Sequence, residues 1–225
     1  MKIFKNKKNL KNELSRIKSI SFVPTMGGLH EGHKYLIKKA KARKGKIIVS
    51  IFVNPKQFNS KKDFNNYPRN VQKDLAILKK LRIDYVYLPT FNDIYNFKPK
   101  NKIYLSPFAN KLCGKFRNSH FKGVLDVVNR LIEIINPKYI FFGKKDFQQF
   151  FLVREHLKKN KIKTNIIPVK TVRNKLGVAH SSRNKNLNNK DLILASYIYK
   201  LIKKEKKKFY KKKLSFNLKK CRKSF

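Results

Sequence analysis

The chain has 225 residues, of which 57 are Lys or Arg and 12 are Asp or Glu, so its formal net charge is +45. Its length and its 41% content of hydrophobic residues are sufficient for a buried core, which argues against wholesale disorder despite the charge. The two cysteines, Cys113 and Cys221, lie outside any CxxC or Cys/His cluster, so neither a disulfide scaffold nor a zinc site is indicated.

The hydrophobic pattern predicts strands that alternate with helices. In chain order the predicted elements are strand 19–23, helix 32–43, strand 47–53, helix 71–81, strand 85–88, helix 123–135, strand 139–142, helix 147–160, strand 164–169 and a last helix from about residue 191. The first strand is predicted to stop at Pro24, because proline cannot donate to a central sheet ladder. This alternation predicts a parallel α/β sheet with helices on both faces.

Polar segments follow four of the predicted strands. They are Pro24–His33, Asn54–Phe58, Gly143–Gln149 and Thr171–Arg183. Ligands of parallel sheets bind outside the carboxyl ends of the strands, so we expect these four segments to meet at one edge of the sheet.

The first polar segment, PTMGGLHEGH, places His30 and His33 three residues apart where a loop enters a helix. Backbone N–H groups at a helix start attract anions, so both imidazoles could donate to a bound phosphate, although such a pair can also be ordinary polar surface. An HxGH sequence after a strand and a glycine turn resembles the signature of the HIGH nucleotidyltransferases, which bind ATP there. No Walker P-loop or GxGxxG fingerprint is present.

A wider set of motifs is more specific. In chain order these are VPTMGGLHEGH (23–33), VSIFVNPKQF (49–58), YPRN (67–70), HFKGV (120–124), FFGKKDFQQ (141–149) and TVRNKLGVAHSSRN (171–184). Together they closely resemble the pantoate–β-alanine ligase (pantothenate synthetase) family, over the range from about residue 21 to residue 187. The resemblance implies a Rossmann-like fold and an ATP-dependent, Mg²⁺-requiring ligation. Pantoate would first form pantoyl adenylate and pyrophosphate, and β-alanine would then displace AMP to give pantothenate.

The resemblance also assigns roles to residues of this chain. The implied catalytic residues, which would stabilise charge on the phosphate oxygens, are His30, His33 and Lys145. The implied ATP-binding residues are Met26, Gly27, Leu29, His30, Glu31, Gly32, His33, Gly143, Lys145, Asp146, Val172, Ser181, Ser182 and Arg183. Gln57 and Gln149 would bind pantoate, Gln57 would also lie near β-alanine, and Asn54 would shape the pocket.

Further roles and departures concern single positions. Met26 and Phe142 would pack against the gem-dimethyl face of pantoate, although Phe142 suits core packing equally well. Asp146 could hold the nucleotide or its Mg²⁺, whereas Asp74 is not assigned as a metal ligand and the metal ligands stay unknown. Two positions depart from the family pattern: Lys144 replaces a common Glu, and His180 replaces a common Met.

The expected organisation is a nucleotide- and pantoate-binding domain over 1–170 and a small, shortened C-terminal lid over 171–225. The sequence continues for about 40 residues beyond the SSRN motif, fewer than is typical of the family. We therefore expect a lid that seals the adenylate incompletely, with some AMP formed even without β-alanine. The family also implies a homodimer.

The basic charge has two interpretations. It is spread along the chain with abundant Asn, Ile, Phe and Tyr, which is typical of a genome under AT mutational pressure, and non-specific adhesion to polyanions would be a by-product. Alternatively, the charge and the dense run over 203–213 indicate an RNA-binding or other polyanion-binding protein with relic enzyme motifs. A third hypothesis, another HxGH nucleotidyltransferase, gives no reason for the two glutamine motifs.

Residues 1–20 lack the apolar stretch of a secretory signal, and no run approaches the ~18 apolar residues of a membrane helix, so we expect a soluble cytoplasmic protein.

Overall fold

The structure is a computed structural model that describes residues 1–212. The chain divides into two compact units, Met1–Thr171 and Val172 onward. The end of the predicted basic tail, with Lys213, and Cys221 lie outside the described residues.

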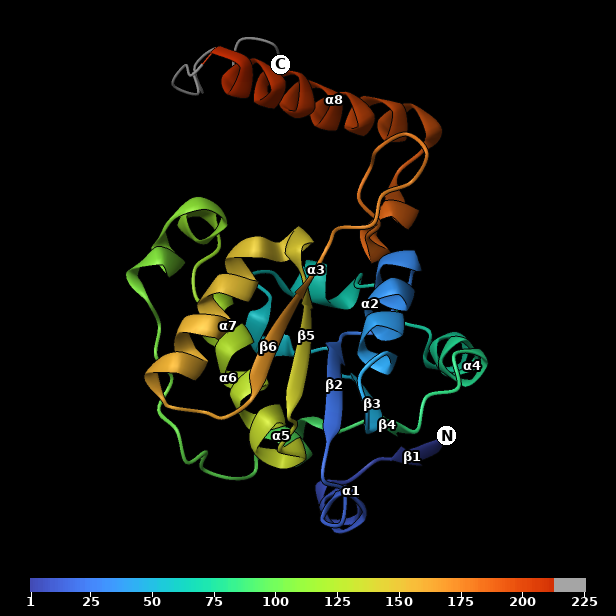
Figure 1. The fold of residues 1–225 in the computed structure, drawn as a ribbon, viewed down its shortest axis with the longest axis vertical. Helices are drawn as coiled ribbons and strands as arrows, with labels where there is room; N and C mark the ends of the chain where they lie inside the picture. The colour runs from blue at the N-terminus through green and yellow to red at the C-terminus, as the bar shows by residue number, and fades with distance from the viewer. Residues whose placement is uncertain (213–225) are drawn as a thin grey trace. The chain divides into compact units, whose positions relative to one another are not determined.

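The first unit alternates strands and helices as predicted (Figure 1). Its strands are β1 (Lys2–Phe4), β2 (Ile20–Thr25), β3 (Lys46–Ile51), β4 (Tyr85–Tyr87), β5 (Tyr139–Gly143) and β6 (Asn165–Val169). Its α-helices are α1 (Lys7–Leu14), α2 (Glu31–Lys41), α3 (Lys61–Asn65), α4 (Val71–Lys80), α5 (Phe91–Tyr95), α6 (His120–Ile135) and α7 (Phe147–Lys159). Short 3₁₀ helices are η1 (Pro55–Gln57), η2 (Pro107–Asn110), η3 (Leu112–Phe116) and η4 (Lys144–Asp146). The sequence pattern did not predict β1 or α1.

All six strands form one parallel sheet in the order β1-β4-β3-β2-β5-β6. The central strand β2 lies between β3 and β5 and is parallel to both, so the loop that follows β2 lies between the loops that follow its two neighbours. In such a sheet the loops after β2, β3 and β5 share one edge, which is where ligands of parallel sheets bind.

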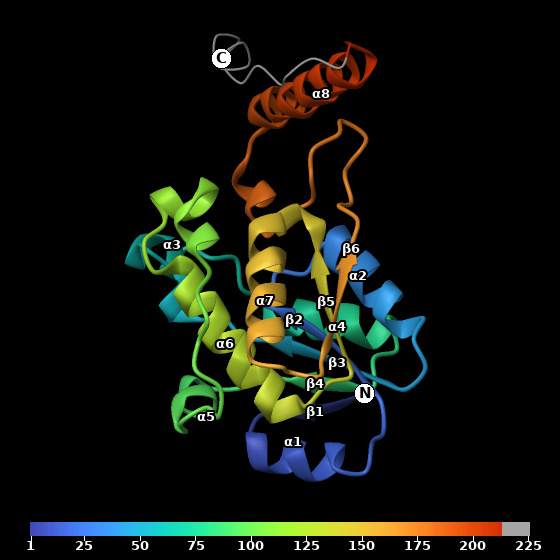
Figure 2. The same ribbon diagram turned by 60° about the vertical axis from the view of Figure 1, so that its left-hand side comes forward.

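Two hydrophobic clusters cover the two faces of this sheet. Alternate residues of a strand point to opposite faces, and accordingly Phe22 belongs to one cluster whereas Val23 belongs to the other. The first cluster contains side chains of α1, α6 and α7, and the second contains side chains of α2 and α4. Figure 2 shows α6 and α7 on one side of the strands and α2 on the other. The predicted α/β fold with helices on both faces is confirmed.

The prediction that the first strand stops at Pro24 is wrong. Pro24 lies within β2 and pairs in register with Ser50 of β3. The carbonyl of Thr25 accepts from Phe52 N, so Thr25 faces β3 and the preceding proline nitrogen points toward β5. Pairing with β5 already ended at Phe22. The missing N–H of Pro24 therefore removes no bond from either ladder.

The second unit contains a hairpin-like loop, the 3₁₀ helix η5 (Ser182–Asn186) and the helix α8 (Asn189–Lys212). An isolated antiparallel bridge joins Arg173 to Ala179, and the Arg173 guanidinium stacks at 3.8 Å over the ring of Tyr199 on α8. Gly177 turns the loop with a φ of +86°, and a Cβ there would lie 2.7 Å from the same ring. The expectation that this unit acts as a lid stays a prediction.

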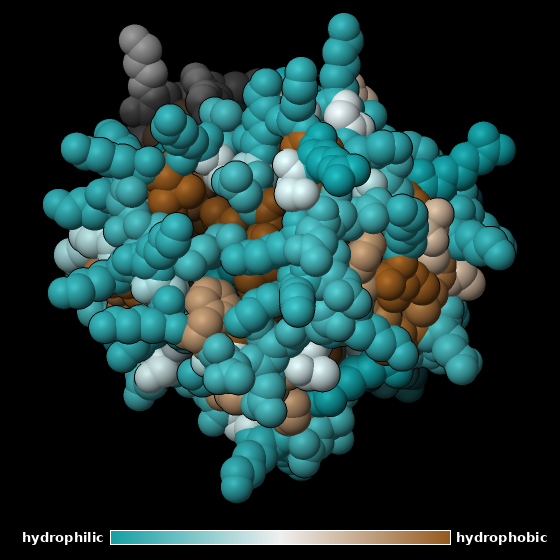
Figure 3. Space-filling view, turned by 90° about the horizontal axis from the view of Figure 1, so that it is seen from below, coloured by the Kyte–Doolittle hydropathy of each residue, from teal (hydrophilic) through white to brown (hydrophobic). Residues whose placement is uncertain are grey.

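Hydrophilic residues cover most of the molecular face in Figure 3, and hydrophobic residues occur there as separated patches. Within residues 1–212, no helix is long and apolar enough to cross a membrane.

Candidate active site

The turn between β2 and α2 is built from two left-handed glycines and a distant carboxylate. Gly27 and Gly28 have φ values of +77° and +62°, which side-chain-bearing residues rarely adopt. The buried Asp74 of α4 accepts from Gly28 N and from Leu29 N, both at 2.8 Å. A Cβ at Gly27 would lie 2.8 Å from an Asp74 carboxylate oxygen. The turn therefore requires glycine both for its backbone angles and for the space that Asp74 occupies.

His30 and His33 stack where this turn enters α2, with ring centroids 4.0 Å apart. His30 is the N-cap of the helix, and its Nδ1 accepts from Gly32 N at 3.1 Å. His33 Nδ1 accepts from His30 N at 3.4 Å. A neutral imidazole that accepts at Nδ1 carries its proton at Nε2, so both rings are N–H donors at their outer nitrogen.

The pKa of His33 is lowered to about 3, mainly because the ring is desolvated and additionally because His30 and the Lys145 ammonium lie nearby. His33 is consequently neutral at physiological pH, and it donates a hydrogen bond without adding charge. The influence of Lys145 also shows that the loop after β5 reaches the turn after β2.

Asn54 and Gln57 form an amide pair in the loop after β3. Asn54 is almost fully buried and donates to Gln57 Oε1 at 3.3 Å and to the Gly123 carbonyl at 3.1 Å. Gln57 Nε2 donates to the sulfur of Met26 at 2.9 Å, which joins this loop to the glycine turn.

Two residues at the start of α6 hold this loop in place. His120 Nδ1 lies 2.7 Å from the Gln57 carbonyl, and a Cβ at Gly123 would lie 2.2 Å from the Lys56 carbonyl. Only glycine permits that approach of helix and loop, which explains the HFKGV motif by packing. Phe142, at the end of β5, is buried in the core cluster, so the core-packing alternative for this residue is confirmed.

Gly143, Lys145 and Asp146 form the loop after β5. Gly143 is the N-cap of η4, and a Cβ there would make only an ordinary van der Waals contact, 4.0 Å from Lys145 N. Lys145 Nζ lies 3.2 Å from Asp146 Oδ1, with 37% and 61% of the two side chains exposed. An exposed pair of this kind is weak and easily exchanged for a ligand phosphate or cation. No cluster of three His, Cys, Asp or Glu side chains within residues 1–212 forms a ready-made metal site.

The adjacent glutamines Gln148 and Gln149 have different environments. Gln148 is buried; it donates to the carbonyls of Phe108 and Lys111 and accepts from Cys113 N, which ties the η2–η3 loop to α7. Gln149 is half-buried, and its side chain makes no hydrogen bond to another residue in the described part of the chain, so its amide can still bind a ligand.

The remaining predicted ATP-binding residues belong to the second unit. Val172 accepts at its carbonyl from His180 N, and Ser181 Oγ accepts from Arg183 N at 3.3 Å as the N-cap of η5. Ser182 is buried and Arg183 is exposed. Their roles toward ATP stay predictions.

Comparison with known proteins identifies the chain's relatives. The family model for pantoate-beta-alanine ligase matches residues 2–224. A pantothenate synthetase of Francisella tularensis subsp. novicida is 42% identical over 203 residues, which cover 88% of this chain and 76% of that protein. The chain belongs to the pantoate–β-alanine ligase family.

Solved structures agree with this assignment. A Francisella tularensis pantoate-beta-alanine ligase, crystallised with beta-gamma ATP and beta-alanine, is 42% identical and covers 90% of this chain and 79% of its own, with a TM-score of 0.84. The Thermus thermophilus pantothenate synthetase is 33% identical and covers 89% and 72%, also with a TM-score of 0.84. The family assignment separates the chain from other HxGH nucleotidyltransferases.

In this ligase-family chain the structure brings together three of the four predicted polar segments, through the contact of Met26 with Gln57 and the proximity of Lys145 to His33. Sequence reasoning missed the anchoring role of Asp74 and the part played by Tyr95, whose hydroxyl donates to Asn54 Oδ1 at 2.9 Å. The anchoring role of Asp74 could have been suspected from its position, four residues after the YPRN motif. Tyr95 lies in no quoted motif, so nothing in the sequence indicated its role.

Proposed function

We propose that this chain catalyses the ATP-dependent condensation of pantoate with β-alanine to pantothenate, through pantoyl adenylate, at the sheet edge formed by the loops after β2, β3 and β5. The observation that carries this assignment is the meeting of the neutral His33 with His30 and the Lys145 ammonium, next to a glycine turn that Met26 joins to the Gln57 amide. Family membership and the ligand-bound relative support it.

In the first step the pantoate carboxylate attacks the α-phosphorus of ATP, and the bond to pyrophosphate breaks. Negative charge then develops on the phosphate oxygens, where donors already fixed in place stabilise the transition state. His30, His33 and Lys145 would supply these donors, while the backbone of Met26, Gly27, Leu29, Glu31 and Gly32 and the loop residues Gly143 and Asp146 would surround the nucleotide. The N-terminus of α2 favours the same charge.

In the second step the β-alanine amine attacks the acyl carbon of the adenylate, AMP leaves, and the amine loses a proton as the amide forms. The reactive intermediate derives from the substrate, so the chain needs no nucleophilic side chain. Its task is to orient pantoate by Gln57 and Gln149 and to hold β-alanine near Gln57, because orientation can supply ~7–11 kcal/mol of the barrier.

The residues present fit a Mg²⁺ ion that arrives with the nucleotide. Mg²⁺ is typically held by one or two carboxylates together with substrate phosphates, and it neutralises phosphate charge. The exposed Asp146 carboxylate would be the protein ligand, whereas both oxygens of Asp74 already accept backbone N–H groups.

Other expectations remain part of this proposal. Val172, Ser181, Ser182 and Arg183 would bind ATP from the second unit, the range 171–225 would act as a lid, and the chain would function as a cytoplasmic homodimer. Polyanion adhesion would be non-specific and sensitive to salt.

The decisive experiment is an assay of AMP and pantothenate formation from ATP, pantoate and β-alanine with Mg²⁺. We expect stoichiometric AMP and pantothenate. A chain with relic motifs would form neither product and would bind RNA at physiological salt, which would overturn the proposal.

A further inference from the structure

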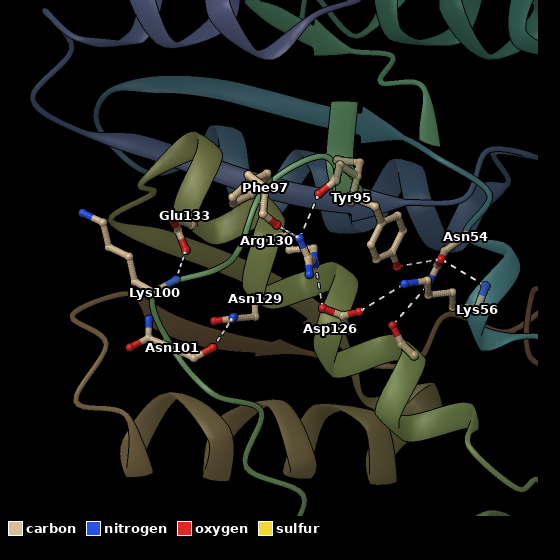
Figure 4. A network of polar contacts seen from close by, with 12 residues as sticks. Asn54, Lys56, Tyr95, Phe97, Lys100, Asn101, Asp126, Asn129, Arg130 and Glu133 are labelled. Carbon is tan, nitrogen blue, oxygen red and sulfur yellow. Dashed lines mark hydrogen bonds and ion pairs between the residues drawn. The ribbon is translucent and has the colours of Figure 1, made fainter. Parts of the chain in front are cut away.

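A polar network adjoins Asn54 of the amide pair (Figure 4). Its other members have no role in the two catalytic steps proposed above. Its centre is Arg130 of α6, whose side chain is only 12% exposed. Arg130 Nε pairs with Asp126 at 2.7 Å, and its Nη1 donates to the backbone carbonyls of Ile94 and Phe97. Arg130 therefore clamps the end of α5 against α6.

The clamped segment carries Tyr95. The Arg130 guanidinium lies 4.9 Å from the centre of the Tyr95 ring, and Lys56 Nζ lies 3.8 Å from that centre. The Tyr95 hydroxyl donates to Asn54 Oδ1 at 2.9 Å. Burial and the nearby Asp126 carboxylate raise the pKa of Tyr95 above its usual value, so the hydroxyl stays protonated and remains a donor.

Backbone groups identify which end of the Asn54 amide is which. Lys56 N can only donate, and it bonds to Asn54 Oδ1 at 3.2 Å. The Gly123 carbonyl can only accept, and it bonds to Asn54 Nδ2 at 3.1 Å. Asn54 therefore accepts from Tyr95 and presents an N–H to its other neighbour, Gln57.

This orientation fixes the neighbouring amide in turn. Asn54 Nδ2 faces Gln57 Oε1, so that oxygen must accept and the Gln57 NH₂ is left on the opposite side, beside Met26. A sulfur atom is a weak acceptor and a poor competitor for this donor. Hydrogen bonds thus run in one direction from the Tyr95 hydroxyl through Asn54 to the Gln57 NH₂.

We propose that Tyr95, clamped by Arg130, is a positioning residue: its hydroxyl reinforces, through Asn54, the orientation in which Gln57 is a hydrogen-bond donor toward pantoate. This inference rests on the proposed function, in which Gln57 binds pantoate. An NH₂ group can donate to any oxygen of pantoate, whereas an amide oxygen could accept only from its hydroxyls and would repel its carboxylate.

The test uses Tyr95→Phe, which keeps the ring and removes the hydroxyl, with Tyr85→Phe as the matched control. Tyr85 is buried, whereas Tyr95 is half-buried, and Tyr85 donates its hydroxyl to a carboxylate, Glu13, that is not connected to Gln57. For Tyr95→Phe we expect the KM for pantoate to rise about 3- to 10-fold, which is the typical effect of losing one neutral hydrogen bond. The kcat and the KM for ATP should stay within about twofold of the wild-type values.

A double-mutant cycle separates positioning from a general effect on the fold. In a Gln57→Ala background, Tyr95→Phe should raise the KM for pantoate no further. An equal rise in both backgrounds would overturn the inference, because Tyr95 would then act independently of Gln57.

A spectroscopic measurement on the ligand-free protein tests the same network without relying on activity. The side-chain NH₂ signals of Asn54 and Gln57 in ¹⁵N-edited NMR spectra should shift in Tyr95→Phe and stay in place in Tyr85→Phe. Unshifted signals in Tyr95→Phe would overturn the positioning role. If the wild-type chain released no pyrophosphate with pantoate and ATP, the proposed function would fall, and the NMR result would still decide whether the relay exists.

Discussion

The glycine turn after β2 and the amide pair after β3 are neighbours, yet they are anchored in different ways. The turn is anchored by a charge, because the Asp74 carboxylate accepts two backbone N–H groups. The amide pair is anchored by neutral groups, in a directed series from Tyr95 through Asn54 to Gln57.

The difference matches what each part would bind. A carboxylate accepts from two backbone N–H groups at once and holds the glycine turn rigidly, and its charge is satisfied by those N–H groups. Neutral amides recognise hydroxyl and carboxylate oxygens without adding a charge to a buried pocket. A substitution at Asp74 should therefore strongly lower the stability of the fold, whereas a substitution in the amide network should only moderately weaken pantoate binding.

The largest expected effect is at the anchor of the turn. Asp74→Ala leaves the buried N–H groups of Gly28 and Leu29 without an acceptor, and each such group costs about 1–3 kcal/mol, so we expect a total loss of ~2–6 kcal/mol. Urea unfolding measures this loss, and Tyr95→Phe provides the comparison from the neutral anchor. A loss for Asp74→Ala no greater than for Tyr95→Phe would remove the distinction between the two anchors.

A second prediction separates rate from stability in the loop after β5, which reaches the glycine turn. Lys145→Ala removes an exposed ammonium, so the free energy of unfolding should change by less than ~0.5 kcal/mol, whereas pyrophosphate release should slow by ~10²–10³. Lys144→Ala is the matched control, since it removes the neighbouring exposed charge. Equal rates for the two variants would exclude a specific role for Lys145.

The smallest expected effect concerns the two adjacent glutamines. Gln149→Ala should weaken pantoate binding by ~1–3 kcal/mol and leave both ATP binding and folding intact, because its amide has no partner within the described chain. Gln148→Ala should destabilise the fold instead, since it removes three hydrogen bonds to the η2–η3 loop. Calorimetric titration of each ligand, together with unfolding curves, distinguishes the two. A stability loss in Gln149→Ala equal to that in Gln148→Ala would contradict this division.

Much of the fold was predictable because its strands and helices have clear hydrophobic periods. The failure at Pro24 arose from register: whether a proline breaks a ladder depends on where the neighbouring strand stops pairing, and β5 stops at Phe22. The strand β1 was not predicted because three residues, KIF, carry too little pattern.

The site was predictable to the extent that its residues lie in motifs. His30, His33, Gln57 and Lys145 belong to such motifs, and the structure brings them to one sheet edge. The contribution of Tyr95 depends on a contact across 41 positions of the chain, and only the folded chain contains it.

The strand order has a consequence for folding during synthesis. The register of β1 joins Lys2 to Tyr85, whereas β2 pairs with β3, which follows it closely in the chain. At the usual elongation rate of ~5–20 residues per second, roughly 4 to 17 s separate the appearance of β1 from that of its partner. The β2–β3 pair, which carries both the glycine turn and the amide pair at its carboxyl end, can therefore form first. The short β1, which begins with a lysine, can join the sheet edge only after β4 has appeared, and it is a poor template for pairing with other nascent chains in the interval.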